Sequence, residues 1–269
     1  MQKISLFFFL QLYFCVILCG MNRDSVLYSR IDLALHKAIM WLVEDEENFK
    51  PETFIIYNYL ERKFNAPPLY NHQEYMISMQ MNERRFNAIY PFLRLIDSSA
   101  TLTKERMAAI NNPMNKTLAQ AIWSDKFGLP TNYFETLKHD ISIGGYKMTH
   151  VYFGLQFLLE HNSPICKTKE FLDLEKEALN ALKNHIKEHP YPGDITIECL
   201  VFLAYTDKGE GYITSDLIEK ILDLQLESGA WHYDEYRHVE EQHTVILAMW
   251  LLYEYRYPNA LAINWLRLH

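Results

Sequence analysis

Apolar residues recur at helical spacing along most of the chain after Ser25. Between Val26 and Leu42 they are separated mainly by three to five residues, which places them on one face of an α-helix. No stretch shows the sustained apolar and polar alternation, bounded by hairpin turns, that predicts β-strands. We therefore expect an all-α fold, and in the first half of the chain we predict further helices over residues 51–64, 71–84, 86–97, 102–111 and 115–125.

The second half of the chain pairs amphipathic segments with segments that are apolar on nearly every side. An amphipathic helix exposes one face to water, whereas a helix that is apolar all round is buried among other helices. Each apolar segment is too short to cross a bilayer, which takes about 20 residues. The pattern predicts outer and inner helices in a single domain over residues 22–269, with pairs at 132–139 and 151–159, 169–188 and 195–205, and 215–226 and 245–252.

The three apolar segments begin in a similar way. Each starts with polar residues, namely Thr149-His150, Thr196-Ile197-Glu198 and His243-Thr244. The step from His150 to Glu198 is 48 residues, and the step from Glu198 to His243 is 45 residues. A repeat of this length is typical of stacked helical hairpins, of which about five would fit in the chain.

One loop between an outer and an inner helix carries a motif. Residues 225–231 read Gln-Leu-Glu-Ser-Gly-Ala-Trp and fit the pattern Q-x-x-x-G-x-W. This resembles the QW motif of squalene and oxidosqualene cyclases, whose relatives include the β-subunits of protein prenyltransferases. The resemblance implies an α/α toroid, a complete or incomplete barrel of helical hairpins in which the motif joins an outer helix to an inner one. Residues 143–146, Ile-Gly-Gly-Tyr, resemble a degenerate copy.

The motif has a structural role and does not indicate a reaction. Glycine allows a tight turn at a helix end, the glutamine amide can bond to nearby backbone groups, and the aromatic ring can cover the helix end. The D-x-D-D acid motif of hopene cyclases is missing. Glu198-Cys199 and His243 only loosely resemble the Asp, Cys and His zinc site of the prenyltransferases. We therefore predict neither a metal nor another cofactor.

The N-terminus predicts export. Lys3 precedes a stretch from Ile4 to Cys19 without charge, whose length is closer to the apolar core of a signal peptide than to a membrane-spanning helix. We expect residues 1–19 to be a signal peptide, with a permanent N-terminal anchor as the alternative. Cys19 at the end of this stretch resembles a bacterial lipoprotein box, which would tether the exported protein to a membrane through a lipid on Cys19.

Charge and cysteine content add two constraints. The net charge of −8 argues against nucleic acid as a partner, because phosphate binding needs clustered Lys and Arg. Export would permit a disulfide between Cys166 and Cys199, but their spacing does not require one.

The starts of the inner helices would meet at one mouth of a ring, which is where a site is to be sought. His150, Glu198 and His243 are the candidate catalytic residues, because two imidazoles and a carboxylate can supply an acid, a base and an orienting group. Neighbouring residues would add rings and carboxylates that suit a carbohydrate or another small molecule, namely Tyr146, Trp231, Tyr233, Asp234 and Glu241.

Each of these residues also has a purely structural interpretation. His150 and His243 can be hydrogen-bonded core histidines, Glu198 can complement a helix dipole, and Thr149 and Thr196 can cap helices. The motifs GxSxG, HExxH, GxGxxG and the Walker loop are absent. Two functions remain. We favour a secreted or lipid-anchored module that binds a ligand or a partner; the alternative is a carbohydrate-active or other acid–base enzyme, a lyase or a hydrolase.

Overall fold

The computed structural model describes residues 23–44, 49–69, 71–235 and 240–267. The predicted signal peptide, including Cys19, lies outside these residues. The structure is about 69% helical and the described residues contain no strand, so the predicted all-α class is confirmed. No described helix is both long and apolar enough to span a membrane.

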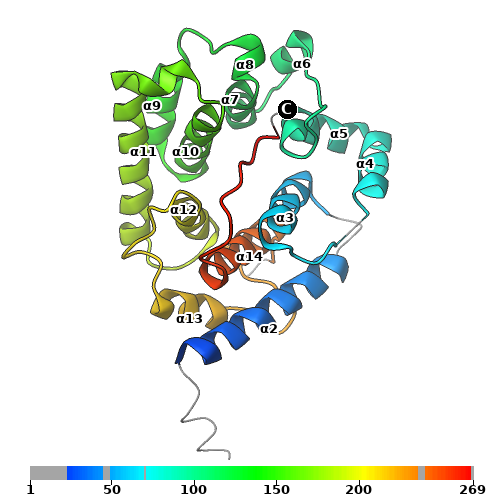
Figure 1. The fold of residues 1–269 in the computed structure, drawn as a ribbon, viewed down its shortest axis with the longest axis vertical. Coiled ribbons are helices and arrows are strands. Elements are labelled where there is room, and N and C mark those ends of the chain that lie inside the picture. The colour runs from blue at the N-terminus through cyan, green and yellow to red at the C-terminus, as the bar shows by residue number, and fades with distance from the viewer. Residues whose placement is uncertain (1–22, 45–48, 70, 236–239, 268–269) are drawn as a thin grey trace, which may run out of the picture.

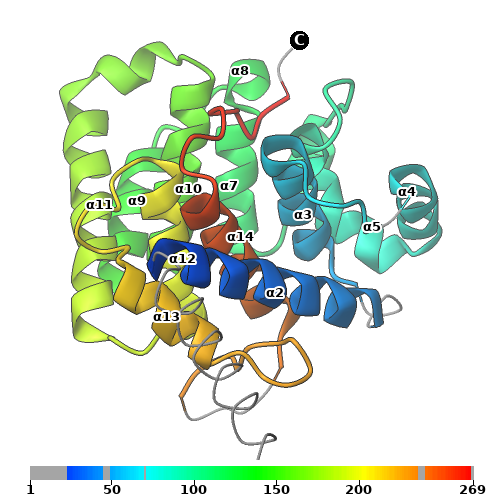
Figure 2. The same cartoon turned by 60° about the horizontal axis from the view of Figure 1, so that its bottom comes forward.

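The longer helices lie in an inner and an outer layer (Figures 1 and 2). The inner helices are successive neighbours in the order α7 (Pro113–Ile122), α10 (Gly145–Glu160), α12 (Asp194–Tyr205), α14 (Gln242–Arg256) and α3 (Pro51–Phe64). Outside them lie α9 (Tyr133–Ile143), α11 (Lys169–Glu188), α13 (Ser215–Asp223) and α2 (Arg23–Glu44). Shorter helices complete the chain: α4 (His72–Met81), α5 (Glu83–Ile89), the 3-10 helix η2 (Tyr90–Leu95), α6 (Lys104–Ala108), α8 (Ser124–Phe127) and η3 (Pro164–Lys167).

The two layers follow from the side chains of each helix. In α11 the fully buried positions lie on one face, as an outer helix requires: Phe171, Leu174, Ala178 and Leu182. In α14 every residue from Gln242 to Tyr253 except His243 is buried. Two short elements lie between α3 and α7: α5 contacts α3 and η2, and η2 contacts α7.

The start of α10 differs from the predicted position. The helix begins at Gly145, directly after α9, and Gly144 and Gly145 have φ angles of 77° and 60°. Glycine adopts these left-handed conformations without steric cost, so the chain reverses between two helices without a longer loop. Thr149 and His150 consequently lie in the second turn of α10 and not at its start.

The proposed capping role of two threonines is wrong. The Thr149 hydroxyl donates to the Tyr146 carbonyl and to Glu198, and the Thr196 hydroxyl donates to the His189 carbonyl. Neither binds the free N–H groups of a helix start, where Gly144 and Gly193 occupy the N-cap positions.

The Q-x-x-x-G-x-W segment fastens its loop to two helices. The Gln225 amide donates to the Gly229 carbonyl at 2.9 Å and to the Ala34 carbonyl of α2 at 2.8 Å. The Trp231 indole N–H donates to the Ile221 carbonyl of α13 at 2.8 Å. Gly229 has φ 99°, and a Cβ there would lie 2.4 Å from the Lys37 carbonyl oxygen, so only glycine fits.

The C-terminal segment crosses the middle of the molecule (Figure 1). The half-buried Glu160 carboxylate accepts the backbone N–H groups of Trp265 at 3.0 Å and Leu266 at 2.8 Å. The Trp265 ring stacks on Tyr59 with centroids 4.1 Å apart, and the Arg62 guanidinium donates to the Trp265 carbonyl. These contacts hold Trp265 against the centre of the inner layer.

The two cysteines of the described chain are free thiols. Cys199 is buried in α12 and Cys166 is half-buried in η3. The disulfide that export would permit is therefore not formed in this structure.

Candidate functional site

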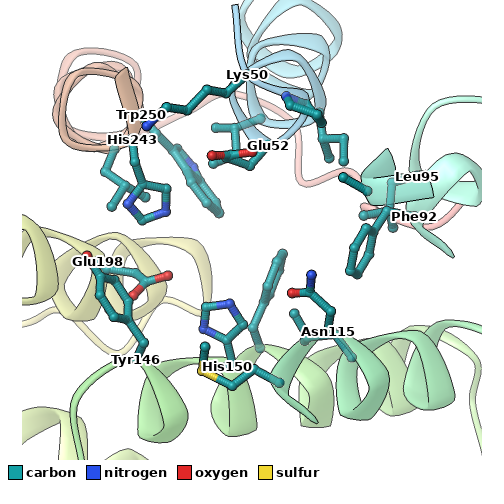
Figure 3. A pocket seen from close by; sticks show the side chains of 18 of the residues that line it. Lys50, Glu52, Phe92, Leu95, Asn115, Tyr146, His150, Glu198, His243 and Trp250 are labelled. Atoms are coloured by element: carbon teal, nitrogen blue, oxygen red, sulfur yellow. The ribbon is translucent and has the colours of Figure 1, made fainter. Parts of the chain in front are cut away.

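A cavity of about 470 Å³ lies at the centre of the inner layer (Figure 3). Side chains from α3, α5, η2, α7, α10, α12 and α14 line it, together with the loop before α14 and Trp265 of the C-terminal segment. Its volume falls within the range of about 300–1,000 Å³ that small-molecule sites occupy.

Most of the predicted site residues line this cavity. His150, Glu198 and His243 come from three different inner helices and all face it, as Figure 3 shows. Tyr146, Tyr233 and Glu241 line it as well.

Trp231 and Asp234 do not line the cavity. The Trp231 ring is buried, and its indole N–H donates a hydrogen bond to the Ile221 carbonyl near the end of α13. Asp234 lies in a separate surface pocket beside His189 and Tyr191. Neither residue therefore contributes to this cavity, and their predicted role in ligand binding stays a prediction.

His243 is held by a carboxylate that the sequence had not indicated. Its Nδ1 lies 3.0 and 3.1 Å from the two Asp194 carboxylate oxygens, and Asp194 also accepts the Thr244 hydroxyl at 2.6 Å and the Tyr146 hydroxyl. Burial alone would lower the pKa of His243, but the hydrogen bond and negative charge of Asp194 outweigh it and raise this pKa to about 9. His243 is thus an imidazolium at neutral pH.

Asp194 is the ionised partner of this pair. Burial alone would raise the pKa of its carboxyl group, yet the hydrogen bonds from His243, Thr244 and Tyr146 and the charge of His243 lower it below its ordinary value. The same carboxylate raises the pKa of the Tyr146 hydroxyl, which is already raised by burial and remains protonated.

Glu198 is the most deeply buried of the acids that directly line the cavity. Its side chain accepts the Thr149 hydroxyl at 2.7 Å, and only 4% of the residue is exposed. Burial raises the pKa of Glu198 to about 7, while the nearby charge of His243 and the Thr149 hydrogen bond oppose the shift. This carboxyl group therefore exchanges its proton near neutral pH.

His150 is the neutral imidazole of the group. Burial, and then the positive charge of His243, lower the pKa of His150 to about 4. Its Nδ1 lies 3.4 Å from the Thr149 hydroxyl oxygen that also binds Glu198. The Tyr146 ring lies near both imidazoles, with centroid distances of 6.4 Å to His150 and 5.9 Å to His243.

Another part of the cavity lining is aromatic. Phe153 of α10 contacts the rings of Phe202, Trp250 and Trp265, with centroids 4.9, 6.5 and 5.2 Å away. These four residues, called the aromatic wall below, all line the cavity. Such surfaces bind apolar or ring-shaped parts of a ligand.

Sequence reasoning missed four polar residues of the site. Asp194 precedes Glu198 by one helical turn, and a search for acids one turn before each candidate would have found it. Lys50 and Glu52 at the start of α3, and Asn115 of α7, also face the cavity (Figure 3). No local signal distinguishes these three from other surface residues, because α3 and α7 meet the site only through tertiary packing.

Within the described part of the chain, no group of three or more His, Cys, Asp or Glu side chains is arranged to hold a metal ion. No protein-family model matches the sequence, and neither the curated proteins nor the solved structures gave a match.

Proposed function

We propose that this protein is an exported α/α toroid whose central cavity binds a small, partly apolar molecule such as a carbohydrate or another compact ligand. The layering of outer and inner helices and the contacts of the Q-x-x-x-G-x-W segment support the toroid. The uncharged stretch before Cys19 supports export, with a lipid on Cys19 as a possible tether. Mass spectrometry of the mature N-terminus distinguishes a free cleaved end from an acylated Cys19.

One observation carries the binding proposal. Polar groups distant in the sequence converge on a single cavity, which the aromatic wall also lines. Buried ionisable groups are costly unless they are paired or used, and a concave apolar site with a few convergent polar groups is the usual form of a small-molecule site.

A cavity-filling substitution tests this proposal. Ala88 lines the cavity yet is solvent-exposed, so Ala88→Trp places an indole in the cavity opening without disturbing the core. We expect ligand-observed NMR with a fragment library to identify binders of the wild-type protein that Ala88→Trp loses at least ten-fold in affinity. Ala108→Trp, at an exposed position of α6, is the matched control and should keep them. Fragments that bind both variants equally would place ligand binding elsewhere.

A second candidate function is acid–base catalysis, favoured by the different protonation states of three neighbouring groups. Neutral His150 can accept a proton, Glu198 can donate one near pH 7, and cationic His243 can stabilise developing negative charge. Lyase and hydrolase reactions on carbohydrates need such groups, although the fold itself does not specify a reaction.

The catalytic candidate is tested with aryl glycosides and uronate polymers. Turnover would appear as released 4-nitrophenol or as the ultraviolet absorbance of unsaturated uronates. His150→Ala and Glu198→Gln should each lower kcat by a factor of about 10² or more if these residues transfer protons. Ligand binding without turnover of either probe class would favour the binding function alone. Turnover that both variants retain would instead assign the proton transfers to other residues.

A further inference from the structure

The charged groups around the cavity do not balance. The described residues that line it, together with Asp194 behind His243, include two cationic side chains, Lys50 and His243. They also include four carboxylates: Glu52, Asp194, Glu198 and Glu241. The site therefore carries excess negative charge whenever Glu198 is ionised, and with Glu198 protonated one negative charge still remains.

Both cations already have a carboxylate partner. The Lys50 ammonium lies 2.6 Å from a Glu241 oxygen, and the His243 ring is bound to Asp194 at 3.0 Å. Glu52 and Glu198 are the carboxylates left over, and both add to the negative potential that raises the pKa of His243. Figure 3 shows the Glu52 and Glu198 side chains pointing into the cavity from different helices. The charge that complements this arrangement is positive.

The aromatic wall supplies a second feature that suits a cation. The faces of Trp, Tyr and Phe rings attract ammonium groups, with gains of about 0.5–2 kcal/mol per contact. Phe153, Phe202, Trp250 and Trp265 are joined into one continuous surface beside the carboxylates, and Phe92 lies across the cavity from His243 in Figure 3. An apolar body would cover the rest of this surface.

We propose that the cavity binds an organic cation, an amine or quaternary ammonium group on an apolar, ring-containing body. The cationic group lies between Glu52 and Glu198, and the body packs on the aromatic wall. This inference rests on the proposed small-molecule site and names its ligand class.

The affinity for a cation should depend on pH. A bound cation favours ionised Glu198, so binding lowers the pKa of this carboxyl group from its value of about 7 and releases a proton. His243 stays charged and His150 stays neutral between about pH 6 and pH 8, so neither changes the charge of the site in this range. If binding lowers this pKa by about one unit, affinity for the cation should rise roughly five-fold from pH 6 to pH 8.

Three probes of one shape test the ligand class: 2-phenylethylamine, 2-phenylethanol and 3-phenylpropionate. Binding to the full-length protein is followed by calorimetry and by the fluorescence of Trp250 and Trp265, which line the cavity. We expect the amine to bind at least ten-fold more tightly than the alcohol, and the carboxylate to bind most weakly. The affinity of the amine, and not of the alcohol, should rise from pH 6 to pH 8.

Substitutions assign the effect to residues. Glu52→Gln should weaken amine binding about ten-fold and leave alcohol binding unchanged, because only the charge is removed. Glu210→Gln, at an exposed position between α12 and α13, is the matched control and should change neither. Phe153→Leu keeps an apolar side chain but removes one aromatic face, and it should weaken the amine several-fold more than the alcohol.

The outcomes separate this inference from the proposed function. Equal binding of amine and alcohol, or tightest binding of the carboxylate, would overturn the cationic ligand while leaving the cavity a small-molecule site. If no probe binds and Ala88→Trp abolishes no fragment binding, both proposals fail. Melting curves of each variant verify that a lost affinity does not come from lost folding.

Discussion

The cavity has two walls whose polar groups differ in burial. Helices α10, α12 and α14 form the first wall, and α3 and α7 form the second. On the first wall Asp194 and Glu198 are 2% and 4% exposed and are hydrogen-bonded to neighbouring helices. On the second wall Glu52 is solvent-exposed and Asn115 is half-buried. Buried charges hold their geometry at a cost in desolvation, whereas exposed charges cost little and are screened by water. The first wall is thus preorganised. Substitutions in the second wall should change the ligand preference of the cavity with little effect on the stability of the fold.

The largest expected effect comes from breaking the Asp194–His243 pair. Asp194→Ala leaves the buried His243 without its partner, and removing one member of a buried pair typically costs about 3–5 kcal/mol. The pKa of His243 should fall from about 9, because burial is then opposed by the weaker contributions of the Glu198 and Glu52 charges and no longer by Asp194. Urea unfolding measures the stability, and an NMR titration of His243 measures the pKa.

Asp32→Ala is the matched control for this variant. Asp32 pairs with Arg256 at the surface, where ion pairs contribute up to about 1 kcal/mol. If the two substitutions destabilise the protein equally, the buried wall is not a structural unit and the contrast between the walls is lost.

Glu198 gives the next largest effect, with the opposite sign. Its folded pKa of about 7 lies above the ordinary value of 4.5, so its contribution to stability is fully present below pH 4.5 and is lost as pH rises through 7. Glu198→Gln removes this loss while keeping an acceptor for Thr149. The free energy of unfolding of Glu198→Gln, relative to that of the wild type, should therefore increase by roughly 2–3 kcal/mol as the pH rises from about 5 to 8.

Chemical unfolding at both pH values measures this gain. Glu177→Gln, on the outer helix α11, is a control that should show no comparable pH dependence. A constant difference between Glu198→Gln and wild type at both pH values would contradict the raised pKa.

The buried wall is also the part of the site that the sequence predicted best. The sequence predicts that His150, Glu198 and His243 lie together, because helical periodicity identifies buried helices and each of these polar residues is near the start of one. The register was imperfect, since the paired glycines Gly144 and Gly145 let α10 begin a turn early. The local sequence pattern is enough to predict such helices, because burial requires apolar residues at helical spacing along their whole length.

The exposed wall could not be predicted in the same way. Lys50 and Glu241 are far apart in the sequence, and nothing in either segment indicates that they meet. The direction of the Trp231 side chain depends on how its loop closes, and the place of Trp265 depends on hydrogen bonds between Glu160 and the C-terminal backbone. Contacts of this kind arise from tertiary packing and leave no periodic signal.

The smallest expected effect on stability comes from Lys50→Met. The Lys50–Glu241 pair is 40% and 35% exposed at its side chains, so solvent screens it and its loss should cost less than about 1 kcal/mol. The same substitution removes a positive charge from the cavity, and affinity for 2-phenylethylamine should therefore rise several-fold. Lys208→Met, at an exposed loop position, is the control and should alter neither quantity. Thermal melting measures the change in stability, and calorimetry measures the change in affinity. If the second wall tolerates substitution, affinity should change while stability does not. A large loss of stability would show that the second wall is held as rigidly as the first.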